Sequence, residues 1–312
     1  MGITHFEQAP QWDAAAGHLR GRWSALGEAA GSVAVGVHRI EVPAGAWATP
    51  AHDHAGAEEL FYVLGGRGIS WCDGVTTEIG AGDAIAYLAG GGAHTLHALE
   101  PLDVLAFGPR HRDGSTRFPR LGLTMVGRRY VESIAGEPGG PLLQFVREAA
   151  VGAPELPEPS APRPANIVNL ADVEAEPLEH SRVRSSRRDL GRATGSVSTG
   201  LAHVEVAPGM EAAPLHCHSA SEEIFVVLAG DGELVLDGAQ PTAVRAGHVV
   251  ARPPATRVAH MFRAGEGGLR FLAYGTREAN DICYYPRSNK LAFSGVGVIV
   301  RVAPLDYWDG ED

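Results

Sequence analysis

The sequence repeats itself once, at a nearly constant offset. The segment GSVAVGVHRIEVPAGAWATPAHDHAGAEELFYVLGGRG begins at Gly31, and GSVSTGLAHVEVAPGMEAAPLHCHSASEEIFVVLAGDG begins at Gly195, an offset of 164 residues without a gap. Further along, GDAIAYLAGGGAHTLHAL corresponds to GHVVARPPATRVAHMFRA, with the matched histidines at an offset of 166. Self-similarity over this length predicts two copies of one domain in a single chain.

A proline-rich segment separates the two copies. Residues 151–165, VGAPELPEPSAPRPA, contain five prolines, which exclude a helix or a central strand and favour an extended linker. The sequence therefore predicts an N-terminal domain over 1–150, a linker over 151–165 and a C-terminal domain over 166–312.

Each copy consists of short apolar or alternating runs between turn residues. The chain has 40 glycines and 21 prolines in 312 residues, and runs such as GVHRIEVPAG and EELFYVLGGRG are bounded by them. This pattern predicts an all-β fold, an antiparallel sandwich or small barrel formed twice. The segment 142–150, LLQFVREAA, is one of the few expected helices.

Each copy contains two histidines one residue apart, followed by a glutamate. On a strand, residues two apart share a face, so His52 and His54 point the same way, and Glu59 opens the next strand on the inward face. A buried carboxylate needs a partner, and imidazoles are common ligands of first-row metals. With the later His94 they make three nitrogen ligands and one oxygen ligand.

The second copy holds the matching set. His216, His218, Glu223 and His260 occupy the corresponding positions. A lone histidine on an apolar face is usually a satisfied core residue, and one such pair could be a surface accident. Two matched sets favour metal binding. A duplicated site of which one copy has lapsed stays open, although neither copy has lost a ligand type.

These motifs resemble those of the cupin superfamily, and the whole chain resembles a bicupin. GMEAAPLHCHSASEEIFVVLAG and GAWATPAHDHAGAEELFYVLGG are similar to the family's first motif, G(x)5HxH(x)3–4E(x)6G. The second motif is matched less closely: Leu88 stands where the family has proline, which Pro253 supplies in the second copy. The resemblance implies two cupin-type antiparallel β-barrel (jelly-roll) domains in tandem, and it suggests a homo-oligomer.

The resemblance also implies a set of possible activities. We expect a metal-dependent, dioxygenase-like oxidoreductase that acts on a small oxygenated organic compound, such as a phenolic or carboxylic acid. A redox-neutral decarboxylase, lyase or isomerase, and a non-catalytic small-molecule-binding bicupin, are the alternatives. The expected metal is Fe(II), with Mn(II), Ni(II) or Zn(II) as further possibilities, because one ligand set serves them all.

Two further residues are candidate catalytic groups. Tyr87 and Arg252 match at an offset of 165, on the strand that leads to the third histidine. Tyr87 could donate a proton, and Arg252 could hold an anionic substrate, although a structural ion pair of Arg252 is the competing interpretation. Because Arg252 and Arg257 precede His260, we expect the chemistry at the second site.

Charge and composition exclude several classes of binding partner. A net charge of −11 argues against nucleic acid, which needs a basic face. No apolar run approaches the length of a membrane span, and the first residues lack an apolar signal region, so we expect a cytoplasmic protein. Three distant cysteines, Cys72, Cys217 and Cys283, indicate neither a disulfide framework nor a thiolate zinc site.

Overall fold

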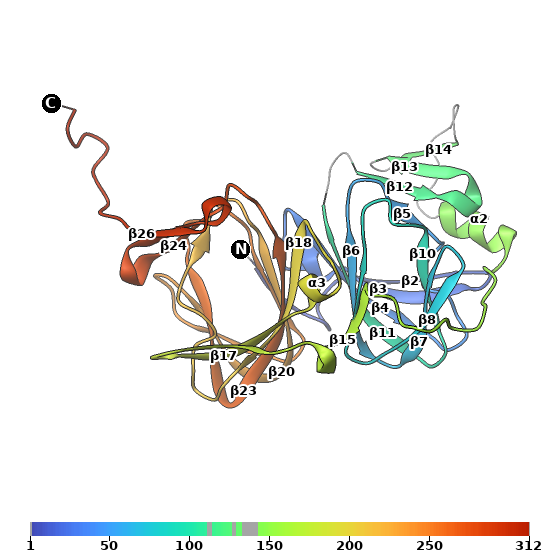
Figure 1. Ribbon diagram of the computed structural model, residues 1–312, viewed down its shortest axis with the longest axis horizontal. Helices are drawn as coiled ribbons and strands as arrows, with labels where there is room; N and C mark the ends of the chain where they lie inside the picture. The colour runs from blue at the N-terminus through green and yellow to red at the C-terminus, as the bar shows by residue number, and fades with distance from the viewer. Residues whose placement is uncertain (1, 111–113, 127–128, 133–142, 312) are drawn as a thin grey trace.

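The computed structural model describes residues 2–110, 114–126, 129–132 and 143–311, which form two β-sandwich halves that lie side by side (Figure 1). The strands pair antiparallel throughout the named ladders, and helices are few and short. The all-β tandem architecture predicted from the repeat is therefore confirmed.

The N-terminal half is built around a seven-stranded sheet in the order β15-β9-β6-β11-β4-β3-β2, which faces a three-stranded sheet, β10-β7-β8. A smaller sheet, β14-β13-β12-β5, and helix α2 cover one end. The elements are β2 (Gln11–Ala16), β3 (Leu19–Ser24), α1 (Leu26–Ala29), β4 (Val35–Val42), β5 (Asp53–His54), β6 (Glu59–Gly65), β7 (Arg67–Cys72), β8 (Val75–Gly80), β9 (Asp83–Tyr87), β10 (His94–Ala98), β11 (Leu102–Pro109), β12 (Ser115–Phe118), η1 (Pro119–Leu121), β13 (Leu123–Val126), β14 (Arg129–Glu132), α2 (Leu143–Val151) and β15 (Ile167–Asn169). The helix expected over 142–150 is thus present as α2.

The C-terminal half repeats this arrangement with longer strands. Its main sheet has the order β1-β22-β20-β23-β18-β17-β16, with β21 paired to β20, and its small sheet is β19-β24-β25-β26. The elements are β1 (Gly2–His5), η2 (Leu170–Asp172), β16 (Glu176–His180), β17 (Val183–Asp189), α3 (Leu190–Ala193), β18 (Thr199–Val206), β19 (Cys217–His218), β20 (Glu223–Leu236), β21 (Thr242–Arg245), β22 (His248–Arg252), β23 (His260–Thr276), β24 (Ile282–Tyr285), η3 (Pro286–Ser288), β25 (Lys290–Phe293), η4 (Ser294–Val296) and β26 (Val298–Arg301).

The two halves exchange edge strands. β1, at the start of the chain, pairs with β22 of the C-terminal sheet, with Gly2 opposite Ala251. β15, which follows the proline-rich segment, pairs with β9 of the N-terminal sheet, with Ile167 opposite Ile85. Each half is therefore completed by a strand that the sequence places with the other half.

The outer faces of the two main sheets pack against each other in a shared apolar core. Leu60, Tyr62 and Phe107 of the N-terminal half and Ile224 and Tyr274 of the C-terminal half are among its buried members. The rings of Phe107 and Tyr274 lie 5.0 Å apart. This core fixes the orientation of the two halves.

The segment 152–165 has no regular secondary structure and lies along the N-terminal half. Trp71 donates to the carbonyl oxygen of Glu155 (2.9 Å), the amide of Ser160 donates to Thr76 (3.0 Å), and Arg163 forms an ion pair with the buried Asp83. The segment is thus extended, as its prolines require. The division into domains over 1–150 and 166–312 stays a prediction.

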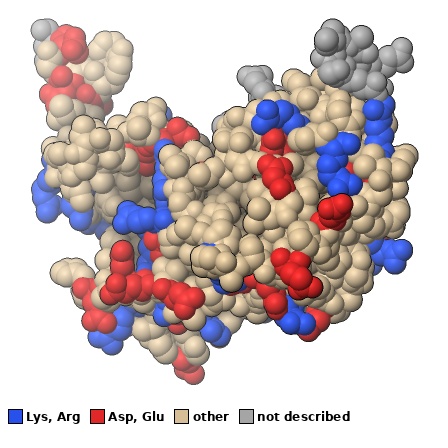
Figure 2. All heavy atoms as spheres, turned by 45° about the vertical axis from the view of Figure 1, so that its right-hand side comes forward, with Lys and Arg blue, Asp and Glu red and all other residues tan. Residues whose placement is uncertain are grey.

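Acidic and basic side chains are interspersed on the face shown in Figure 2. In the part of the chain that the structure describes, no helix is both long and apolar enough to cross a membrane.

Candidate metal centres

The N-terminal candidate ligands come from three segments that meet at one end of the barrel. His52 and His54 lie at β5, Glu59 is the first residue of β6, and His94 is the first residue of β10. His52 and His94 form an antiparallel bridge, with both backbone amide-to-carbonyl hydrogen bonds present. The chain is folded so that two residues separated in sequence by the strands β5 to β9 face each other directly.

The four N-terminal side chains converge on one point. Oε2 of Glu59 lies 3.0 Å from Nε2 of His94, 3.5 Å from Nε2 of His52 and 3.7 Å from Nε2 of His54. His52 and His94 are buried. The histidines and glutamate predicted as ligands are therefore brought together.

The C-terminal centre reproduces this geometry. Oε2 of Glu223 lies 3.1 Å from Nε2 of His260, 3.4 Å from Nε2 of His218 and 3.7 Å from Nε2 of His216. His216 and His260 also form the matching backbone bridge. Both copies of the repeat thus retain the same constellation.

The donor atoms fit a divalent first-row metal. With bonds of about 2.1 Å, neighbouring ligand atoms of an octahedral ion are about 3 Å apart, and the separations of 3.0–3.7 Å lie near this value. Within the described residues, Oε2 of Glu223 and Nε2 of His260 are buried and have no hydrogen-bond partner. Such orphaned atoms are costly, and a shared cation would satisfy them.

Five of the six histidines are oriented by a partner at their other ring nitrogen. Nδ1 contacts the carbonyl oxygen two residues earlier in His52 (2.9 Å), His94 (3.1 Å) and His216 (2.8 Å). Nδ1 of His54 lies 3.2 Å from the hydroxyl of Thr116, and Nδ1 of His218 lies 2.6 Å from Oδ2 of Asp281. A proton held at Nδ1 leaves the lone pair of Nε2 for a metal, as is usual for ligating histidines.

Electrostatics in both centres favour ionised glutamates. Burial opposes ionisation of Glu59, but the hydrogen bonds of His52, His54 and His94 hold its pKa well below the usual range. Burial likewise opposes ionisation of Glu223, and the three histidines beside it hold its pKa well below the usual range. Burial lowers the pKa of His260 to about 4. A metal requires a carboxylate beside neutral imidazoles, so at neutral pH it must displace the proton of His218, whose pKa, against the effect of burial, is raised to about 9 by Glu223 and Asp281.

Sequence reasoning missed the supporting residues Thr116 and Asp281. Both lie beside the small sheets, far along the chain from the histidines that they contact. The repeat itself gave no signal, because the FPR and YPR segments align at an offset of 167, which places Gly114 opposite Asp281 and Thr116 opposite Cys283. Cys283 is buried, and together with His216 and His218 it forms a cluster of potential ligand atoms.

The two centres differ in the space around them. A cavity of about 890 Å³ in the C-terminal barrel is lined by the four ligands and by apolar side chains that include Phe225, Phe262 and Phe271. The pocket at the N-terminal centre has only about 200 Å³ and contacts His54 and Glu59.

Aromatic side chains fill the N-terminal barrel. Trp47 and Trp71 are buried there, with their rings 6.5 Å apart. At the offset of 164 these positions are Glu211 and Val235 in the second copy. The half with the larger cavity therefore carries a charged side chain and a smaller apolar one where the other half has two tryptophans.

Tyr87 and Arg252 each lie opposite a ligand glutamate on a neighbouring strand. Tyr87 pairs with Glu59 and Arg252 with Glu223. The ring of Tyr87 stacks on His94 at 3.8 Å and its hydroxyl bonds Ser70 at 2.7 Å. Arg252 is buried and donates to the carbonyl oxygen of Val258. Neither residue lines the larger cavity, so both are placed to support the ligands, and their catalytic roles stay predictions.

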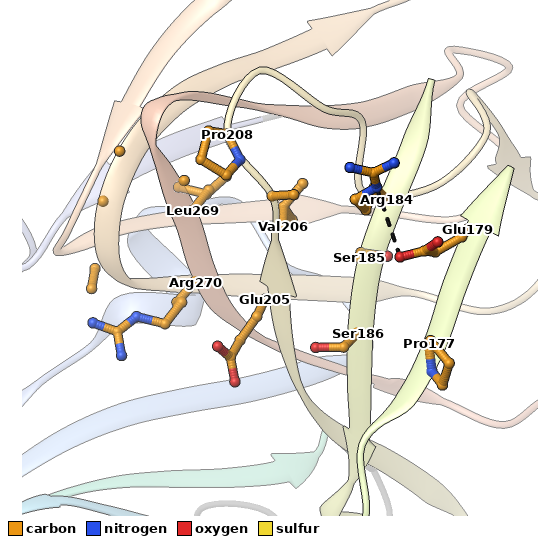
Figure 3. Close-up of a pocket in the computed structure, with 15 residues that line it drawn as sticks. Pro177, Glu179, Arg184, Ser185, Ser186, Glu205, Val206, Pro208, Leu269 and Arg270 are labelled. Atoms are coloured by element: carbon orange, nitrogen blue, oxygen red, sulfur yellow. Dashed lines mark ion pairs between the residues drawn. The ribbon is translucent and has the colours of Figure 1, made fainter. Parts of the chain in front are cut away.

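A second hollow lies on the outer face of β16, β17, β18 and β23, away from both centres (Figure 3). It has a volume of about 520 Å³ and contains the ion pair between Arg184 and Glu179 (3.7 Å). Its lining includes none of the candidate ligands, so we assign the metal chemistry to the barrel interiors.

Comparisons with known proteins agree with this architecture. The cupin domain model matches residues 38–107 and 202–274, once in each half. No curated protein matches the sequence. An oxalate decarboxylase structure from Bacillus subtilis is 18% identical, with a TM-score of 0.58 over 90% of this chain and 78% of that one. The oxalate decarboxylase of Lactobacillus farciminis is also 18% identical, with a TM-score of 0.57 over 89% and 86% of the two chains.

At such identities the likeness to solved structures establishes the fold. The family match adds that each half is a cupin domain, and each half carries the ligand constellation described above. The protein is therefore a bicupin and belongs to the cupin superfamily.

Proposed function

We propose that the protein is a metal-dependent enzyme that acts on a carboxylic acid at its C-terminal centre, in a redox-neutral reaction of the decarboxylase, lyase or isomerase type. The observation that carries this proposal is the cavity of about 890 Å³, which reaches all four C-terminal ligands. Catalytic sites are typically concave, largely apolar and equipped with a few converging polar groups.

The comparisons favour this reaction class over the oxygen-using one. The bicupins of similar fold named above are oxalate decarboxylases, and the dioxygenase-like activity expected from sequence has no support among them. The cavity is larger than oxalate requires, and its phenylalanine walls suit a substrate with an apolar body. We therefore favour an aromatic or otherwise bulky carboxylic acid.

Mn(II) is the metal that we propose. A solved structure of similar fold, 17% identical with a TM-score of 0.55, is described by its Mn(II) centres, whereas Fe(II), which we expected first, lacks such support. One carboxylate and three neutral imidazoles suit Mn(II) among several divalent ions. The residues that would hold it are His216, His218, Glu223 and His260, with the equivalent four residues as a second site.

The protein's own residues would bind and orient the substrate. Bound metal supplies a Lewis acid that polarises a substrate oxygen and stabilises negative charge that develops on it. Arg187 and Arg277 line the same cavity and could attract a carboxylate. Phe225, Phe262 and Phe271 would pack on its apolar body and exclude water, which strengthens electrostatic interactions in the site.

The test is turnover of a panel of phenolic and carboxylic acids by Mn(II)-loaded protein, with and without oxygen. We expect product formation that persists without oxygen and consumes none. Glu223→Ala should abolish turnover, while Glu59→Ala should retain most of it, each variant being checked for folding and remaining metal. Strict dependence on oxygen would return the assignment to the dioxygenase-like class, and the opposite response of the two variants would move the chemistry to the N-terminal centre.

A further inference from the structure

Each ligand glutamate is preceded by a second glutamate, and the two side chains point in opposite directions. Glu58 precedes Glu59, and Glu222 precedes Glu223, at the same offset of 164. Since successive side chains of a strand alternate between its faces, Glu59 and Glu223 enter their barrels. Glu58 and Glu222 leave their own domain and enter the other one.

Glu222 of the C-terminal domain binds the loop after α1 in the N-terminal domain. Its carboxylate accepts hydrogen bonds from the consecutive backbone amides of Val33 (2.9 Å), Ala34 and Val35 (2.9 Å). Glu222 has 0% exposure. Three successive amides that converge on one carboxylate form a backbone anion nest.

Glu58 makes the reciprocal contact with the loop after α3 in the C-terminal domain. It accepts from the amides of Val197 (2.9 Å) and Thr199 (2.6 Å) and from the hydroxyls of Ser196 (2.6 Å) and Thr199 (2.5 Å). Glu58 is 4% exposed. The two contacts are related by the same pseudo-symmetry as the two metal centres.

The contacts of Glu58 and Glu222 lie directly beside the ligand glutamates. Glu59 and Glu223 are the first residues of β6 and β20, so Glu58 and Glu222 lie where the chain enters each strand. A buried carboxylate is stable only while its hydrogen bonds are kept, so each nest fixes the peptide unit directly before a ligand. The position of each ligand therefore depends on a loop of the opposite domain.

An arginine joins each loop to the centre of its own domain. Arg277 lines the C-terminal cavity and donates to the carbonyl oxygen of Ser196 (3.1 Å). Arg110 lines the pocket beside Glu59 and donates to the carbonyl oxygen of Ser32 (3.3 Å). Each loop thus touches the surroundings of one centre and the glutamate that positions the other.

We propose that Glu58 and Glu222 are positioning residues through which each domain completes the metal centre of the other. This inference rests on metal binding by the two ligand sets and is independent of the reaction proposed above.

A substitution in one domain should therefore weaken metal binding in the other. Thr199→Val removes one hydroxyl donor to Glu58 and keeps the side-chain shape. The matched control is Thr194→Val, which removes a buried hydroxyl from the same region whose hydrogen bonds stay within its own domain, to Leu190 (2.8 Å) and Gly191 (3.0 Å).

Binding of Mn(II) alone is followed from the electron paramagnetic resonance signal of the free ion. In protein whose C-terminal centre is removed by His216→Ala with His218→Ala, Thr199→Val should weaken Mn(II) binding about tenfold, the lower end of the loss for a direct partner of a ligand, because Thr199 acts on Glu59 through Glu58. Thr194→Val should leave it unchanged. Where the N-terminal centre is removed instead by His52→Ala with His54→Ala, Thr199→Val should have no effect.

Glu222→Gln tests the reciprocal contact, because it replaces an acceptor oxygen by an amino group that faces backbone amides. It should weaken the C-terminal centre and spare the N-terminal one. If the variants that lack two histidines do not fold, the single variants Thr199→Val and Thr194→Val, with both ligand sets intact, are instead loaded with Mn(II) and passed through gel filtration. Thr199→Val should lose about one ion per chain. Equal affinities in Thr199→Val and Thr194→Val, or equal weakening of both centres, would overturn the inference. If the unsubstituted protein binds no Mn(II), the inference and the proposed function both fail.

Discussion

Asp281 lies 2.6 Å from Nδ1 of His218 and joins the C-terminal ligand set to the strand β24 that follows it. The carboxylate is itself fixed by the backbone amides of Ala220 (2.9 Å) and Ser221 (3.1 Å). In the N-terminal half, Nδ1 of the corresponding His54 contacts a neutral hydroxyl instead, that of Thr116. The two centres therefore share their ligands but differ in the charge behind one histidine.

Asp281→Asn should weaken metal binding at the C-terminal centre. The substitution keeps the size of the side chain but removes the negative charge that orients His218 and raises its basicity, so we expect a loss of about 10- to 100-fold in Mn(II) affinity. Titration of the ion into metal-free protein measures this change. The affinity of the N-terminal centre should not change and is the internal control. A C-terminal affinity that is the same in Asp281→Asn and in the unsubstituted protein would contradict the role given to Asp281.

The C-terminal centre should bind metal more tightly as pH rises. Burial disfavours protonation of His218, but Glu223 and Asp281 outweigh it and raise its pKa to about 9. Below that value a metal must displace a proton, so affinity should increase with pH up to about 9 and then level off. Calorimetric titrations in buffers of several pH values measure this dependence, and flat affinity below pH 8 would contradict it.

The raised pKa of His218 also makes the stability of the metal-free protein depend on pH. Because the folded-state pKa of His218 is raised above its ordinary value, the stabilisation is fully present below about pH 6.5 and is lost as pH rises through about 9. Thermal unfolding of metal-free protein should therefore shift to lower temperature over this interval. Asp281→Asn should reduce the shift.

The ion pair between Glu148 of α2 and Arg120 of η1 should contribute to stability. Glu148 is fully buried, and its Oε1 lies 2.9 Å from Nε of Arg120. Burial raises the pKa of Glu148 although Arg120 opposes this. Arg120→Met should lower the free energy of unfolding by about 3–5 kcal/mol, because it removes the nearer partner of a buried carboxylate and leaves it beside His18, whose Nε2 lies 3.8 Å from Oε1.

The double variant Arg120→Met with Glu148→Leu should recover most of that loss. Denaturant unfolding of the two single variants and the double variant gives the coupling free energy. Additive effects would show that Arg120 and Glu148 do not depend on each other.

Much of the candidate site could be predicted because it lies in local sequence patterns. The H-x-H pairs and following glutamates are close in sequence, and strand alternation alone places His52 and His54 on one face. The repeat then supplied the second centre and the tandem domains. The exchange of β1 and β15 between sheets could not be read in this way, because short edge strands pair wherever the assembled halves leave a free edge.

Other features are visible in the sequence, but their role could be recognised only in the structure. The doublets Glu58-Glu59 and Glu222-Glu223 are visible in the repeat, but only the packing of the halves shows that one member of each crosses to the other domain. Trp47 aligns with Glu211 in the repeat, but only the structure shows that the two barrels enclose cavities of different size. Arg252, on which the expectation of chemistry at the second site rests, does not line the larger cavity.

The size of the C-terminal cavity leads to the last prediction. Ala273 lines it, and a larger side chain at this position of β23 would occupy space that the proposed substrate needs. Ala273→Phe should abolish binding of aromatic acids such as 4-hydroxybenzoate while formate, which is much smaller, still binds. Both ligands are detected by their effect on the electron paramagnetic resonance spectrum of the bound Mn(II). Ala273→Ser, which adds one oxygen atom, serves as the control, and metal content and thermal unfolding establish that each variant is intact. If Ala273→Phe binds 4-hydroxybenzoate as the unsubstituted protein does, the substrate does not lie in this cavity, and the assignment of the reaction to the C-terminal barrel loses its main support.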